Sequence, residues 1–96
     1  MRNVKIAKST RPGKKYQAKF EDGPIVHFGA AGMSDYTKNK DSNKKKAYIA
    51  RHKANENWRD KESAGFWSRY LLWEKPSLRE AAKALRSKGL NVTLQG

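Results

Sequence analysis

The stretch that most constrains the fold is residues 65–73, GFWSRYLLW, which gathers several large apolar side chains into nine positions. A helix that is apolar around most of its circumference is usually buried, and burying side chains of this size is worth roughly 1.5–3 kcal/mol each. A chain of 96 residues can hardly leave all of them in water. We therefore predict a short helical segment over residues 64–75 that packs against a sheet. Its expected core members are Phe66, Leu71 and Leu72, whereas Trp67 and Trp73 fit either the core or its edge.

The N-terminal residues 1–29 predict an antiparallel meander. Residues 3–8, 15–20 and 25–28 alternate in hydrophobicity, and the two connections contain Pro12-Gly13 and Gly23-Pro24, which favour turns. In this arrangement the side chains of Lys5, Lys15 and Lys19 lie opposite the apolar strand faces and give the sheet a polar face.

The C-terminal residues predict one further helix and one further strand. Residues 77–88 begin with an S-x-x-E capping box, Ser77 to Glu80, and end at Gly89. Residues 90–95 follow as a candidate strand beside the N-terminal one. The chain is thus predicted to form a single α+β domain over residues 1–96, with a small antiparallel sheet packed against two or three short helices.

Residues 41–59 predict a basic helix, which follows a loop over residues 30–40. Alanines and a tryptophan recur at helical spacing along it and are expected to form its buried stripe: Ala47, Ala50, Ala54 and Trp58. The other faces carry a concentration of positive charge that begins in the preceding loop, with Asp41 as the one acid between Lys38 and Lys53. The cluster consists of Lys38, Lys40, Lys44, Lys45, Lys46, Arg51 and Lys53.

This cluster points to an anionic partner. Like charges at helical spacing repel one another, and lysines in the first turn oppose the helix macrodipole, so the arrangement costs stability that a polyanion would restore. A solvated surface that only confers solubility is the alternative. The whole chain has 22 Lys and Arg against nine Asp and Glu, a net charge of +13, which suits nucleic acid, an anionic membrane or an acidic protein. The chain turn at Pro12-Gly13, between the first two predicted strands, supplies further candidate contacts through Arg11, Lys14 and Lys15.

Arg69 has two interpretations. It lies in the rigid aromatic segment, where a guanidinium is held ready to bind phosphate. It can equally serve an internal role, stacked on a ring or paired with Glu74 or Asp60.

Other functional classes receive less support from the sequence. The chain has no cysteine, which removes disulfides and sulfur-based zinc sites, and no phosphate-cradling loop, nucleophile elbow or HExxH motif occurs. His52, Glu56 and Asp60 recur every four residues, as on any solvated helix. We expect no enzyme, no metal and no cofactor. Without an apolar run of about 18 residues or a secretory signal, we also expect a soluble intracellular protein.

Three stretches, together with the RPGKKY turn, carry a resemblance to known proteins: HFGAAGMSDYT (27–37), YIARHKANENW (48–58) and AGFWSRYLLWEKPSL (64–78). They resemble small basic proteins of unassigned function encoded by large double-stranded DNA viruses and some phages. The resemblance spans roughly residues 11–80. It implies a viral origin and a role in the virion or on the genome, and it supplies no catalytic residues.

The sequence therefore predicts a non-catalytic protein that binds nucleic acid, DNA in preference to RNA, through phosphate contacts with limited sequence selectivity. The main alternative is a structural virion protein that uses the same charge to bind acidic capsid surfaces.

Overall fold

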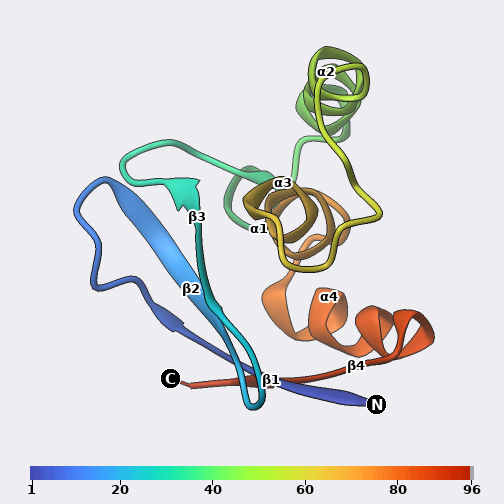
Figure 1. Ribbon diagram of the computed structural model, residues 1–96. Helices are drawn as coiled ribbons and strands as arrows, with labels where there is room; N and C mark the ends of the chain where they lie inside the picture. Colours follow the sequence, from blue (N-terminus) through green and yellow to red (C-terminus); the bar gives the residue numbers. More distant parts are fainter. Residues whose placement is uncertain (96) are drawn as a thin grey trace.

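The computed structural model describes residues 1–95 and has a four-stranded sheet with short helices on one side of it (Figure 1). The strands are β1 (Arg2–Lys8), β2 (Lys14–Phe20), β3 (Ile25–Ala30) and β4 (Leu90–Leu94). The α-helices are α1 (Tyr36–Asn39), α2 (Ser42–His52), α3 (Ala64–Trp67) and α4 (Leu78–Ala84). A π-helical turn, η1 (Ser68–Leu72), continues α3, and a 3₁₀ turn, η2 (Leu85–Lys88), continues α4. The predicted α+β class is confirmed.

The sheet has the order β3-β2-β1-β4 and is mixed. The predicted meander is present, because β2 pairs antiparallel with both β1 and β3. The C-terminal strand also lies beside β1, as predicted, but it is parallel to it, with Val4 opposite Val92. The expectation of a purely antiparallel sheet is therefore wrong at this edge, because the chain crosses the sheet through its helices before it returns as β4.

One core joins the sheet to the helices. The inward faces of the strands contribute Val4, Ile6, Ala18 and Phe28, and the predicted aromatic segment packs on them. The Trp67 side chain is fully buried, and its ring lies 5.9 Å from that of Phe20 and 6.0 Å from that of Phe28. The prediction for the core members of the segment is confirmed, since Phe66, Leu71 and Leu72 are buried. Trp73 lies at the edge of the core.

The helix ends follow local capping chemistry. Ser63 begins α3 by accepting a hydrogen bond from the backbone N–H of Phe66 (3.1 Å), and Ser77 begins α4 by accepting one from Glu80 N–H (3.2 Å). Gly89, at a φ of 81°, ends η2 in the left-handed conformation that glycine adopts at little cost. Ser77 and Gly89 thus end the C-terminal helical segment as predicted, whereas the Glu80 side chain makes no return hydrogen bond to Ser77 N–H among the described residues, so the capping box is half formed.

Helix α2 is shorter than the predicted span 41–59, and its buried side is different. It ends at His52, where the backbone leaves the helix in a turn in which Asn55 N–H donates a hydrogen bond to the His52 carbonyl (3.1 Å). Tyr48 is the buried residue of α2. The expected stripe is wrong, since Ala47, Ala50 and Ala54 are exposed.

Candidate nucleic-acid interface

The candidate interface centres on α2, which stands apart from the sheet in Figure 1. Asp41 caps the helix by accepting hydrogen bonds from Asn43 N–H (2.9 Å) and Lys44 N–H (3.3 Å). No acidic residue lies in the first helical turn, and Lys44, Lys46 and Arg51 are exposed. Lys53, just beyond the helix, is exposed too. Within residues 1–95, none of these four cations has a carboxylate within 4.0 Å.

Lys45 differs from its neighbours because it anchors the helix. Its ammonium group donates a hydrogen bond to the Glu74 carbonyl (2.8 Å), lies 3.7 Å from the Glu74 carboxylate and sits 5.1 Å from the ring centre of Tyr36. These contacts join α2 to the segment that follows η1. Lys45 is therefore a structural contact, although the sequence grouped it with the exposed lysines.

A stack of rings makes the second attachment of α2. The ring of Tyr48 lies 4.5 Å from that of Trp73 at an interplanar angle of 5°, and 4.3 Å from that of His52. The His52 Nδ1 atom lies 3.4 Å from the Glu56 carboxylate. Burial, reinforced by the Glu56 charge, raises the pKa of Tyr48 from 10.0 to about 12. The stack leaves the opposite side of the helix facing solvent.

A cleft of about 330 Å³ separates α2 from the body of the domain. Arg51 and His52 line its helix side, and Lys14, at the start of β2, lines its sheet side. The floor includes Leu72 and Trp73. Asp35 and Glu56 also line the cleft. The cleft therefore places Lys14 and Arg51, from two segments that are separate in the sequence, on opposite sides of a lining of mixed charge.

The turn before β2 is fixed against the loop that leads to α2. Gly13 has a φ of 82°, and its carbonyl accepts a hydrogen bond from Ala31 N–H (3.0 Å). Ser9 Oγ accepts one from Arg11 N–H (3.0 Å). Arg11 and Lys14 are exposed. The turn thus holds Lys14 on the sheet side of the cleft, and the exposed Arg11 lies in the same turn, where its carbonyl accepts a hydrogen bond from Lys14 N–H (3.3 Å).

Lys15 is removed from this surface by a buried ion pair. Its ammonium group lies 2.6 Å from the Asp35 carboxylate, and the two side chains are 7% and 2% exposed. Asp35 also caps α1, accepting hydrogen bonds from Thr37 N–H (2.9 Å) and from the Thr37 hydroxyl. The expectation that Lys15 lies on the polar face of the sheet is wrong, because this pair holds the loop over residues 30–40 in place. Lys5 and Lys19 are exposed as expected.

Lys38 and Lys40 lie between the turn and α2. Both are exposed, and Lys40 ends α1 in the left-handed conformation, with a φ of 52°. Its ammonium group donates a hydrogen bond to the Thr37 carbonyl (3.3 Å). The two lysines extend the basic surface along the segment that connects the cleft to the helix start.

Arg69 has the internal role that the sequence left open as an alternative. Its guanidinium donates a hydrogen bond to the Glu74 carboxylate (2.6 Å) and lies 5.3 Å and 5.0 Å from the ring centres of Trp58 and Tyr70. The side chain is 14% exposed. Arg69 and Lys45 therefore share Glu74, and together they tie α2 to the aromatic segment.

Sequence reasoning missed Tyr48, His52 and Trp73 as a unit. Tyr48 and His52 are four residues apart, which indicates a shared helix face, but the sequence contains no signal that the facing ring is Trp73. Among the residues that the structure describes, no three His, Asp or Glu side chains gather as a metal site, and no helix is long and apolar enough to span a membrane.

A family model described as a family of unknown function (DUF5754) matches residues 4–52. The match covers about half of the chain, and the protein belongs to this family. The matched residues contain β1, β2, β3, α1 and α2, and so include Lys14 and Arg51 on the two sides of the cleft, whereas the floor residues Leu72 and Trp73 lie outside the match. Neither the curated proteins nor the solved structures contain a match to the chain.

Proposed function

We propose that the protein is a non-catalytic nucleic-acid-binding protein that contacts the phosphate backbone through α2 and the turn before β2. The observation that carries the proposal is the cleft whose two sides are lined by Lys14 and Arg51. Neither side chain has a carboxylate within 4.0 Å among the described residues. The acids that also line the cleft have other partners, since Asp35 pairs with Lys15 and Glu56 lies 3.4 Å from His52. Within residues 1–95, Lys14 and Arg51 have no such partner, and cations held on two separate supports suit an extended polyanion.

The contacts are of the kind that position a backbone. The available groups are lysines and arginines on exposed helix and turn positions, which bind phosphates without regard to sequence. Release of counterions from the nucleic acid would supply the free energy of binding. We favour DNA over RNA because of the resemblance to proteins of double-stranded DNA viruses, which also suggests a genome-associated role.

The test is a binding titration with matched variants. Fluorescence anisotropy with duplex DNA, single-stranded DNA and duplex RNA is measured over a salt series for the wild-type protein and for Lys44→Gln/Lys46→Gln/Arg51→Gln. The variant Arg79→Gln/Lys83→Gln/Arg86→Gln removes the same number of charges elsewhere and is the control. If about three phosphate contacts are lost, the slope of log K against log salt becomes shallower by about 3 in the first variant only.

Two outcomes would contradict the proposal. Weak binding to every nucleic acid would favour a structural virion protein that binds acidic protein surfaces. An equal loss in both variants would show that net charge alone, and not the cleft and α2, produces the affinity.

A further inference from the structure

The edge of the sheet at β4 is a second surface with its own chemistry. Among the described residues β4 has one neighbouring strand, β1, so its other edge is unpaired. The sequence of β4, LNVTL, contains no proline, glycine or charged residue, and these are the usual means by which proteins protect an edge. The opposite edge is different, because β3 follows Pro24 and contains Gly29 at a φ of 78°.

The backbone groups on the free edge of β4 can be assigned from two hydrogen bonds. Gly89 carbonyl accepts from Arg2 N–H (3.0 Å), and Gln95 N–H donates to the Ile6 carbonyl (2.8 Å). Along a strand, successive residues direct their N–H and C=O groups to opposite edges. Residues 89, 91, 93 and 95 therefore face β1, and Val92 and Leu94 direct their backbone groups away from it.

A groove of about 350 Å³ runs between β4 and the helix α4 with its continuation η2. Its apolar lining includes Ala82, Val92 and Leu94. Leu94 is 36% exposed and is among the few large apolar side chains at the surface. The basic lining consists of Arg79, Lys83 and Arg86, and no acidic residue lines the groove.

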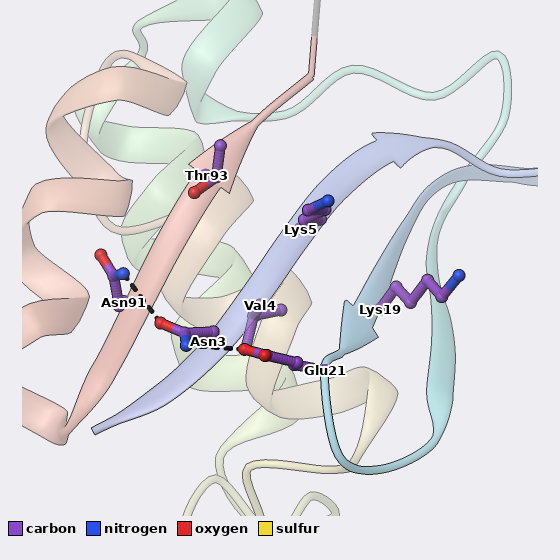
Figure 2. A pocket seen from close by; sticks show the side chains of 7 residues that line it. All are labelled: Asn3, Val4, Lys5, Lys19, Glu21, Asn91 and Thr93. Atoms are coloured by element: carbon purple, nitrogen blue, oxygen red, sulfur yellow. Dashed lines mark hydrogen bonds between the residues drawn. The ribbon is translucent and has the colours of Figure 1, made fainter.

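The open face of the sheet beside β4 is also positively charged. Figure 2 shows Lys5 and Lys19 on this face, with Lys5 between Thr93 of β4 and Lys19 of β2. Lys5 lies directly opposite Lys19 on one side and Thr93 on the other. The nearby Glu21 accepts a hydrogen bond from the Asn3 side chain (2.6 Å), and Asn3 in turn accepts one from Asn91 (2.8 Å). Both sides of the β4 edge therefore present lysines or arginines.

We propose that β4 binds an extended acidic segment of a partner protein, which adds to the sheet as a fifth strand. The free N–H and C=O groups of Val92 and Leu94 would pair with the backbone of the segment. Its apolar side chains would enter the groove beside Ala82, and its carboxylates would meet Arg79, Lys83 and Arg86. A second copy of this chain fits poorly, because the same three cations would face one another. The proposal does not depend on nucleic-acid binding.

Proline substitution provides a sharp test, because it removes a backbone N–H. Leu94→Pro deletes an outward N–H without breaking a bond to β1, and an edge strand tolerates such a proline. Leu94→Ala is the matched control that loses the side chain and keeps the N–H. Circular dichroism and thermal melting establish that each variant is folded. The probe is a fluorescent synthetic peptide with the sequence EVDVEVD, and KVKVKVK is the peptide control.

The expected result is binding of EVDVEVD and no binding of KVKVKVK. Leu94→Pro should weaken the affinity about tenfold relative to Leu94→Ala, as for the loss of one hydrogen bond, and Arg79→Gln/Lys83→Gln/Arg86→Gln should weaken it at least as much. The variant Lys44→Gln/Lys46→Gln/Arg51→Gln should bind the peptide normally, even if it no longer binds DNA.

Four results would overturn the inference. Three of them are equal affinities for Leu94→Pro and Leu94→Ala, equal binding of the two peptides, and a wild-type dimer that Leu94→Pro dissociates. Competition between duplex DNA and EVDVEVD that depends on Arg79, Lys83 and Arg86 would also overturn it, because the groove would then be a nucleic-acid surface.

Discussion

Helix α2 and the segment formed by α3 and η1 are both short, yet different forces hold them. The α3–η1 segment buries four side chains, Phe66, Trp67, Leu71 and Leu72, against the sheet. In the 11 residues of α2 the buried residue is Tyr48, and a lysine and a ring stack attach the helix. Hydrophobic burial therefore stabilises the body of the domain, whereas α2 buries one side chain and carries exposed positive charge.

The largest effect on stability is expected from removing the side chain of Trp67, which lies in the hydrophobic core. Trp67→Ala deletes a fully buried ring that contacts Phe20, Phe28 and Phe66 and whose Nε1 donates a hydrogen bond to the Lys61 carbonyl (2.8 Å). The free energy of unfolding should fall by about 3–5 kcal/mol, as measured by chemical denaturation. The half-buried Trp58 is the control. An equal effect of Trp58→Ala would contradict the assignment of the core.

The next largest effect on stability is expected from breaking the buried ion pair between Lys15 and Asp35, which holds the loop before α2 in place. Asp35→Ala leaves the ammonium group of Lys15 buried without its partner, and the free energy of unfolding should fall by about 3 kcal/mol. Much of this loss should be absent when Lys15→Met is the starting protein, because no buried charge then remains. Chemical denaturation of the wild type, Asp35→Ala, Lys15→Met and the double variant measures the coupling free energy between Lys15 and Asp35. Additive effects would show that the pair is not buried in solution.

A smaller, local effect is expected for the attachment of α2. Tyr48→Ala removes the ring stacked on Trp73, and the free energy of local opening of α2 should fall by about 2 kcal/mol. Hydrogen exchange should show faster exchange for α2 amides and unchanged protection for the sheet. Tyr48→Phe keeps the ring and is the control. Loss of protection in the sheet as well would mean that α2 and the body unfold as one unit.

The smallest effect follows from the pKa of Tyr48. Burial raises this pKa to about 12 from 10.0, so the neutral phenol favours the packed state, and its contribution is complete below pH 10. Stability should decline as the pH rises from about 10 to 12, by about 1 kcal/mol at pH 11. Ultraviolet absorbance should show a tyrosine ionisation with a midpoint near pH 12. A late transition that persists in Tyr48→Phe would contradict the assignment.

Local signals in the sequence predicted the elements well where the chemistry is local. Alternation predicted β1, β2 and β3, Ser77 and Gly89 predicted the ends of the C-terminal helical segment, and the apolar density of residues 65–73 predicted burial. Each of these depends on neighbours within a few residues. They need no knowledge of the rest of the fold.

The features that the sequence did not predict depend on distant partners. Lys15 pairs with Asp35 across 20 residues, and Lys45 contacts Glu74 across 29. The alanines of α2 have helical spacing, but the helix rests on Tyr48 because Trp73 is available to stack on it. The parallel direction of β4 likewise follows from the path of the chain through the helices. For the candidate site, the sequence identified basic residues, and the fold decided which of them remain free.

The most direct test of the central claim is whether the sheet side and the helix side of the cleft bind one polyanion together. The salt dependence of duplex DNA binding is measured for Lys14→Gln, Arg51→Gln and the double variant, with Lys83→Gln as control. The account predicts that each single change makes the slope of log K against log salt shallower by about 1 and the pair by about 2, with no change for the control. An unchanged slope for Lys14→Gln would contradict it, because α2 would then bind DNA without the turn across the cleft.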